Sequence, residues 1–388
     1  AQGGNDTIYG DAYYRMDYHV ENGVDRSRLV DVGDDWIESG LGFDKVYGDA
    51  YLVRQYDSDD VDAFAPFAPL ILGNDTIINL GGTGNLWGDA ARIEVGKSIG
   101  ADVAVTGGND TIMGGENTDV IYGDATRMTV QGVTLGTTAT VLGGDDGLTG
   151  EAGTGTIYGD VQYFTVDDVE AFAILAGGND QISGGDGTDR VYGDAFSFQF
   201  TLSHATAVLD FSGGDDSISG GAGADTIYGD GYRLSDLNGT GVVGQQVSFR
   251  AGNDTIDAGA DNDTVYGDLQ VVAVNDGVIT ITAGDDIING GEGNDQLYGD
   301  FLSVEVSIGS VMTRGADTFV FEANSGVDVV HDFEVDRDLL DISDYGHTGI
   351  ADVILTVADG NTTVDFDESN SVRLIGVTSL NSDDFIFA

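Results

Sequence analysis

The sequence has no cysteine and few basic side chains. It holds 14 Lys and Arg residues against 68 Asp and Glu residues, and its only lysines are Lys45 and Lys97. Without cysteine, no disulfide can staple the fold. At a net charge of −54, the surface is a poor partner for nucleic acid. A chain with this charge repels itself, so we expect a compact state only when cations neutralise the carboxylates.

Long apolar runs and a catalytic constellation are also missing. No apolar run is long enough to span a bilayer, and the sequence does not begin with a signal peptide. His19, His204, His331 and His347 are widely scattered, and no HExxH zinc motif occurs. Residues 96–100 match the GxSxG nucleophile motif in letters only, because no helical period surrounds them. We therefore predict that the chain is neither an enzyme nor a transmembrane protein.

Glycine and aspartate are abundant and regularly spaced. A motif close to GGNDTIYGD recurs between Gly3 and Asp300 at steps of 32 to 40 residues, and each copy ends in an aromatic residue, Gly and Asp. A period of this length predicts a solenoid. The Gly-Asp tails end at Asp11, Asp49, Asp89, Asp124, Asp160, Asp194, Asp230, Asp268 and Asp300.

A second spacing, of nine residues, separates pairs of Asp inside the units. Carboxylates presented by Gly-rich turns are the oxygen ligands that Ca²⁺ prefers, so we predict several calcium ions. In two units the second carboxylate is missing, because Asp75 is followed by Gly84 and Asp146 by Gly155, and we expect weaker sites there. The predicted ligands, besides the tail residues, are Asp6, Asp35, Asp44, Asp75, Asp110, Asp119, Asp146, Asp180, Asp189, Asp216, Asp225, Asp254, Asp263, Asp286, Asp295 and Asp317.

Residues 290–298, GGEGNDQLY, show the pattern most clearly. They resemble the GGxGxDxUx nonapeptide of the repeats-in-toxin (haemolysin-type calcium-binding) family, where U is a large apolar residue. The resemblance extends over residues 3–317. It implies a parallel β-roll in which six residues of each nonapeptide form a calcium-binding turn and three form a short strand.

The residues between the turns favour strands. Ile37, Ile77 and Ile112 recur at one place in their units, two residues after the first Asp, and can stack in a narrow core. The Tyr or Trp before each Gly-Asp tail is expected to form a stacked ladder rather than a carbohydrate platform.

An insertion of 13 to 22 residues follows each Gly-Asp tail. One edge of the roll should therefore keep short calcium turns while the other carries an excursion from every coil. Residues 271–274 and 278–281 flank Asn275-Asp276-Gly277, a strong hairpin signal, and Asn22-Gly23 and Asn238-Gly239 offer further turns. We predict hairpins; the alternative is one extra coil without calcium in each unit.

From Gly315 the repeats stop, which divides the chain into a calcium-binding roll at residues 1–314 and a C-terminal region at residues 315–388. The C-terminal region resembles that of serralysin-type secreted proteins, and the resemblance implies a cap and a type I secretion signal. The fold class we predict is all-β: a parallel β-roll solenoid with calcium-binding Gly/Asp turns, a β-hairpin insertion in each coil and a C-terminal β cap.

Two functions fit these features. The first is a calcium-dependent extracellular structural protein of a Gram-negative bacterium that assembles with itself, as a surface layer, filament or matrix component. The second is the calcium-binding export module of a larger secreted hydrolase or adhesin, because the sequence opens in mid-coil at Ala1. We favour the first, because the insertions build one continuous lateral face and could contact a cell surface or matrix.

Overall fold

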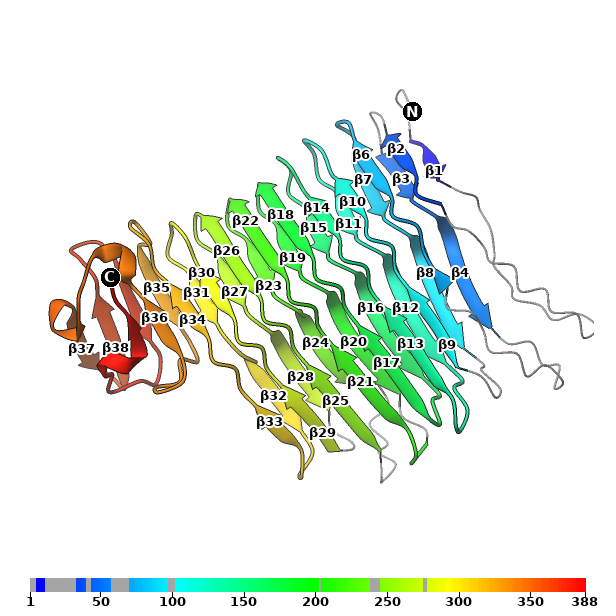
Figure 1. The fold of residues 1–388 in the computed structure, drawn as a ribbon. Coiled ribbons are helices and arrows are strands. Elements are labelled where there is room, and N and C mark those ends of the chain that lie inside the picture. Colours follow the sequence, from blue (N-terminus) through cyan, green and yellow to red (C-terminus); the bar gives the residue numbers. More distant parts are fainter. Residues whose placement is uncertain are drawn as a thin grey trace, which may run out of the picture.

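The strands stack along one long axis into a slab (Figure 1). The structure is a computed structural model that describes residues 5–10, 33–39, 43–56, 70–96, 102–201, 204–237, 245–274 and 278–388. Within these residues, the elements are 40 β-strands and three short 3₁₀ helices, η1 (Ser343–Tyr345), η2 (Ile350–Asp352) and η3 (Ser382–Asp384). The strands form four sheets, two in what we call the roll lobe and two in the arm lobe.

The roll lobe consists of the repeat motifs themselves. Its sheets run along the slab from β1 and β2 to the C-terminal cap (Figure 1). Roll sheet 1 contains, in spatial order, β1 (Thr7–Tyr9), β3 (Phe43–Tyr47), β7 (Thr83–Trp87), β11 (Val120–Tyr122), β15 (Thr156–Tyr158), β19 (Arg190–Tyr192), β23 (Thr226–Tyr228), β27 (Thr264–Tyr266), β31 (Gln296–Tyr298), β35 (Val327–Val330), β39 (Ser371–Leu374), β38 (Asn361–Asp365) and β37 (Ile354–Ala358). Roll sheet 2 contains β2 (Trp36–Ser39), β6 (Thr76–Asn79), β10 (Thr111–Met113), β14 (Gly147–Thr149), β18 (Gln181–Asp186), β22 (Ser217–Ala222), β26 (Thr255–Ala260), β30 (Ile287–Asn289), β34 (Thr318–Val320), β36 (Leu339–Asp341) and β40 (Phe385–Ile386).

The arm lobe consists of the insertions. Its two sheets have eight strands each. Arm sheet 1 contains β4 (Ala50–Tyr56), β8 (Ala90–Gly96), β12 (Ala125–Gln131), β16 (Val161–Asp167), β20 (Ala195–Thr201), β24 (Gly231–Asp236), β28 (Leu269–Val274) and β32 (Ser303–Val306). Arm sheet 2 contains β5 (Leu70–Ile71), β9 (Val103–Thr106), β13 (Thr138–Leu142), β17 (Phe172–Ala176), β21 (Val208–Ser212), β25 (Gln246–Arg250), β29 (Val278–Thr282) and β33 (Val311–Thr313).

Each coil from β2 through β33 therefore visits all four sheets in turn. Strand β10 leads through the outer turn, residues 114–119, into β11, and Gly123-Asp124 then bends the chain into β12. After the arm tip, β13 returns and residues 143–146 bend the chain into β14. The two bends meet between the lobes, at a place we call the waist. The predicted all-β parallel solenoid is confirmed.

The arms differ from hairpins in their pairing. Each insertion does send out one strand and return another, but among the described residues no outgoing strand pairs with its own returning strand. Instead, β12 pairs in parallel with β8 and β16, and β13 with β9 and β17. The two arm sheets face each other across a core that includes the fully buried Phe164, Phe198, Phe200, Phe211 and Phe249. The predicted turns at residues 22–23, 238–239 and 275–277 lie outside the described residues.

The roll lobe has a narrower core and an aromatic ladder. One buried aliphatic residue per strand stacks on its neighbour, such as Ile121 on Ile157. The predicted ladder is present: ring centroids of successive members lie 4.5 to 5.4 Å apart from Tyr9 through Tyr298. His331, which the sequence did not predict as a member of the ladder, stacks on Tyr298 with ring centroids 4.3 Å apart and ends the ladder.

The strands after residue 315 continue only the roll lobe. Strands β35 and β39 extend roll sheet 1 in parallel, and antiparallel β38 and β37 close it. Strands β34, β36 and β40 extend roll sheet 2, whereas the arm sheets end at β32 and β33. The structure thus leaves the C-terminal end of the arm lobe without the strands that cover the roll lobe.

Candidate metal centre

The first row of carboxylates lies at the outer turns, between the strands of the two roll sheets. Glycine allows the turn itself, because Gly221 and Gly259 have φ of 102°, in the left-handed region. The Oδ1 of Asp225 accepts the backbone N–H of Asp189 one coil earlier, at 2.7 Å, and Asp263 accepts in the same way from Asp225. We call this the outer row; its predicted members are Asp6, Asp44, Asp119, Asp189, Asp225, Asp263 and Asp295.

The second oxygen of these carboxylates is buried without a hydrogen-bond partner. This holds for Oδ2 of Asp119, Asp189, Asp225, Asp263 and Asp295. An unpaired buried anionic oxygen is costly unless a proton or a cation meets it. In these five coils the outer row therefore offers one oxygen to a cation.

The two units without an outer carboxylate keep the row's backbone geometry. Gly84 lies opposite Asp44 in the paired strands, and its N–H donates to Asp119 Oδ1 at 2.6 Å. There the Asn79 side chain also donates to Asp119 Oδ1, at 2.9 Å, so an amide stabilises this carboxylate. The N–H of Gly155 donates to Asp189 Oδ1. Both gaps supply one anionic oxygen fewer than the units with Asp.

The second group of carboxylates fills the waist in two rows. From Asp75 onward, members of the first waist row follow the returning arm strands, and each Oδ1 accepts the N–H of the equivalent Asp one coil earlier, as Asp146 does from Asp110 at 2.6 Å. The predicted members of this row are Asp35, Asp75, Asp110, Asp146, Asp180, Asp216, Asp254, Asp286 and Asp317.

Members of the second waist row are the Gly-Asp tails. Each reaches across the waist to the returning arm of its own coil: Asp230 accepts the N–H of Gly252 at 2.8 Å, and Asp268 that of Gly284 at 2.9 Å. The described members are Asp49, Asp89, Asp124, Asp160, Asp194, Asp230, Asp268 and Asp300. Asp11 lies outside the described residues.

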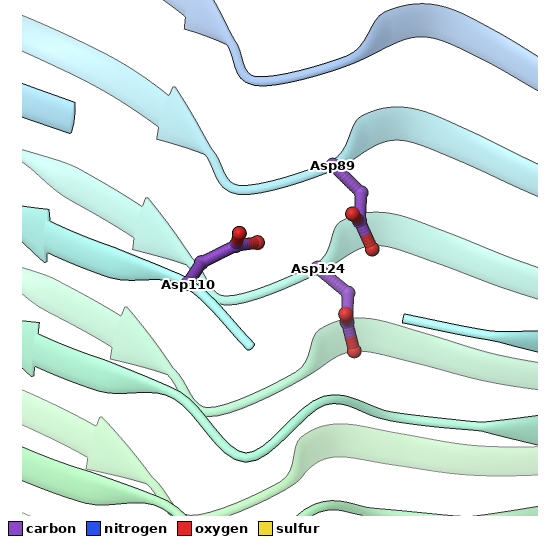
Figure 2. Close-up of side chains that lie close together, drawn as sticks. All are labelled: Asp89, Asp110 and Asp124. Carbon is purple, nitrogen blue, oxygen red and sulfur yellow. The ribbon is translucent and has the colours of Figure 1, made fainter. Parts of the chain in front are cut away.

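Three waist carboxylates come close enough to share one ion. One oxygen from each of Asp89, Asp110 and Asp124 lies within 4.8 Å of the other two (Figure 2). They come from three segments: the bend after β7, the bend after β9 and the bend after β11. The Oδ2 of Asp110 and the Oδ1 of Asp124 have no hydrogen-bond partner, and all three residues are at most 2 % exposed.

Burial dominates the electrostatics of the waist. It raises the pKa of Asp124 to about 6 and that of Asp216 to about 8. The pKa of Asp110 is raised first by burial and then by the charge of Asp146. At neutral pH the folded waist therefore needs either protons on its carboxyls or cations between them.

Glycine makes room for these carboxylates. A Cβ at Gly123 would overlap the Oδ2 of Asp146 and the carbonyl oxygen of Gly159, and a Cβ at Gly107 would overlap the carboxylate of Asp124. The recurrent glycines of both bends thus allow close approach of backbone and carboxylate. The donor set contains only oxygen, which fits Ca²⁺ and not the thiolate- and imidazole-binding metals.

A family model matches the same segments. The RTX calcium-binding nonapeptide repeat matches residues 1–12, 31–50, 102–126, 176–197, 212–231, 250–270 and 282–301. This chain carries RTX calcium-binding repeats. The matched segments contain outer turns and waist bends and leave out most of the arm strands. Residues 51–101 and 127–175, which include the outer turns at Gly84 and Gly155, lie outside the matches. No curated protein matches the chain.

The RTX repeats place nearly all predicted ligands in three buried rows. Every predicted Asp among the described residues is buried except Asp6 and Asp35, which are partly exposed. The sequence missed Asp328 and Asp338, which continue the outer and first waist rows by accepting the N–H of Asp295 and Asp317. The sequence did contain a signal for both residues. Each is followed two positions later by an apolar residue, Val330 or Leu340, as the Asp residues of the repeats are. In the part of the chain that the structure describes, no helix is long and apolar enough to cross a membrane.

Proposed function

We propose that this RTX repeat protein is a calcium-dependent extracellular structural protein that assembles head to tail with copies of itself. RTX repeats bind calcium and are typical of secreted proteins, which supports the first half of the proposal. The second half rests on the end of the arm lobe.

The observation that carries assembly is the exposed end at β32 and β33. These are the terminal strands of their sheets, and their surroundings expose apolar side chains: Ile308 fully, Val311 to 55 % and Met312 to 40 %. A terminal strand presents backbone donors and acceptors that another strand can pair with. Among the described residues, β4 and β5 are the opposite terminal strands of the same two parallel sheets, so the natural occupant is the β4–β5 end of a second copy. Such a contact does not close on itself and extends into a fibre.

Sedimentation of the full chain in millimolar calcium tests this assembly. Val311→Lys combined with Met312→Lys adds two charges to the edge and should reduce polymers to monomers while leaving the β signal intact. The matched control is Ile354→Lys with Val357→Lys on β37, which ends roll sheet 1 and where the two residues are 66 % and 56 % exposed. Polymers that survive the first pair, or dissolve with the second, would contradict the arm-end contact. A wild-type chain that stays monomeric would favour the export module of a larger secreted protein.

We also propose export from a Gram-negative cell by a type I machine, with residues 315–388 as the signal. A calcium-poor cytosol would keep this acidic chain extended for threading, and external calcium would then fold it. Secretion of an unrelated reporter fused to residues 315–388, only in cells that contain such an exporter, is the expected result. A reporter retained inside these cells would argue against this route.

A further inference from the structure

The second waist row ends on an arginine. Asp300 is its last member, and the Nη1 of Arg314 lies 3.0 Å from Asp300 Oδ2. The Oδ1 of Asp300 accepts the N–H of Gly315 at 2.8 Å, so both oxygens are partnered. Asp300 is buried, whereas the Arg314 side chain is 30 % exposed and reaches inward from the surface.

Earlier members of the row have the same hydrogen bond but no arginine. The Oδ1 atoms of Asp194, Asp230 and Asp268 accept from Gly214, Gly252 and Gly284 at 2.8 to 2.9 Å. Their Oδ2 atoms have no partner. The guanidinium of Arg314 thus meets the one oxygen that is left unpaired in these three coils.

The strand register shows that Arg314 occupies a repeat position. Thr282 pairs with Thr313, so Arg314 corresponds to Ala283 and, further back, to Ala251, Gly213 and Gly177. At Gly177 and Gly213 even a Cβ would overlap the carboxylate of the following tail, Asp194 or Asp230. In these two coils the following tail excludes a long side chain, whereas no Gly-Asp tail follows Arg314.

The next coil provides that condition. Leu297 pairs with Val330, and continuing this register places Phe333 opposite Asp300. Glu334 then holds the guanidinium from the other side, with its Oε1 3.2 Å from Arg314 Nε. The carboxylate of Asp332 accepts the N–H groups of Gly299 and Asp300, at 3.0 Å each.

We propose that Arg314 takes the place of a bound cation at the last position of the second waist row. The guanidinium supplies the positive charge that calcium supplies in the preceding coils, so the row ends without a metal ion. The Asp300 carboxylate is then paired with a positive charge before calcium arrives. The inference rests on the calcium binding in the proposed function and is independent of assembly.

Counting bound calcium in matched isosteric variants tests the proposal. Each full-length variant is dialysed to equilibrium in millimolar calcium, and calcium per chain is measured by elemental analysis, with circular dichroism as the check of folding. Asp268→Asn, one coil before the end, should lose at least one calcium per chain. Asp300→Asn should keep the wild-type count, because its partner is Arg314.

The reverse substitution should create a site. Arg314→Gln leaves the Asp300 carboxylate without its cation and should raise the count by one, whereas Arg314→Lys should keep it. Arg337→Gln is the control, because Arg337 pairs with Glu334 and not with Asp300. Loss of a calcium ion in Asp300→Asn equal to that in Asp268→Asn would overturn the proposal, and so would an unchanged count in a folded Arg314→Gln chain. A wild-type chain that binds no calcium would instead overturn the proposed function.

Discussion

At the scale of single residues, two glycines in the outer row are where we expect the calcium sites to be weak. Gly84 and Gly155 both hold positions where neighbouring coils have Asp, and neither has a positive φ. At Gly84, the Asn79 amide already donates to the neighbouring carboxylate of Asp119. At Gly155 the N–H of the glycine donates to Asp189 Oδ1 without such an amide beside it, so this gap is the better place to restore a ligand.

We expect Gly155→Asp to add a calcium ligand. A Cβ there would lie 3.3 Å from Asp189 Oδ1 and 3.5 Å from the carbonyl oxygen of Asp119, which needs only a small adjustment. In millimolar calcium the variant should unfold at a higher temperature, with a gain on the order of 1 kcal/mol. Thermal unfolding by circular dichroism measures this, and without calcium the sign should reverse. Gly155→Asn is the control; an equal gain there would show that charge plays no part.

Gly159→Asp should disrupt folding, because its Cβ would overlap Gly193.

The titration of the buried carboxyls predicts opposite pH responses with and without metal. Burial raises the pKa of Asp119 to about 6 and those of Asp216 and Asp263 to about 8, against about 4 in an unfolded chain. The folded state therefore holds protons that the unfolded state releases. Their contribution to stability is fully present below about pH 4 and is lost as the pH rises through 6 to 8.

A calcium-free chain should accordingly gain β structure when the pH falls from 8 to 5, and the calcium-bound chain should lose calcium over the same range because protons displace it. Circular dichroism of the metal-depleted chain across this range is the measurement. A metal-free chain whose β content is constant from pH 5 to 8 would contradict the pKa assignment.

Residue spacing predicted which Asp residues align in rows but not how carboxylates of different rows group together. Asp119 and Asp189 could be predicted because each stands nine residues after another Asp, within one local motif. The grouping of Asp89 with Asp110 could not, because a whole arm separates them along the chain. Only the closure of the arm back to the waist brings them together.

At the scale of elements, the arms show what the alternation of apolar and polar residues along a strand can and cannot predict. Phe198 and Phe200 in β20 and Leu209 and Phe211 in β21 alternate with period two, which correctly predicts two strands with one buried face each. The same pattern satisfies a hairpin and a pair of facing sheets. Stacking of coils at a fixed register selects the second, because every arm strand then pairs on both sides along the slab.

Facing arm sheets make Phe198 a central core residue. Its ring centroid lies 5.4 Å from that of Phe164, 5.1 Å from Phe249 and 6.1 Å from Phe211. Phe198→Ala should reduce the free energy of unfolding by about 3–5 kcal/mol. Denaturant unfolding measures the loss, and hydrogen exchange should show its largest increase in the arm strands. Leu237→Ala, at a site that is 52 % exposed, should cost less than about 0.5 kcal/mol. Equal costs for the two variants would mean that the arm sheets do not pack on each other.

At the scale of the whole molecule, charge and fold are coupled. The chain carries a net charge of −54, and most of the repeat Asp residues are buried. Excess chelator at neutral pH should leave it largely disordered. Millimolar calcium should restore the β signal in circular dichroism, and equal magnesium should not, because Mg²⁺ requires a strict octahedral set of ligands and retains its waters. A chain that keeps its full β signal after exhaustive chelation would contradict this coupling.

The period of the sequence sufficed to predict the solenoid, since a repeated Gly-Asp motif with one aliphatic and one aromatic residue per strand can only stack on itself. The sequence did not predict that the C-terminal strands extend the roll lobe and leave the arm lobe uncovered. Whether residues 315–388 cover one lobe or both depends on where β37 and β38 fold back, and their sequence gives no period that fixes this place.

The direction of the hydrogen bonds between coils gives the molecule a mechanical character. Because the strands lie across the slab, the bonds that join one coil to the next run along its long axis (Figure 1). A pull along that axis loads the interfaces in series, so coils detach one at a time. Each detached coil frees 32 to 40 residues, or about 110–140 Å of chain. The carboxylate rows run through these interfaces. The force needed to detach a coil would therefore rise with the calcium concentration of the surrounding solution.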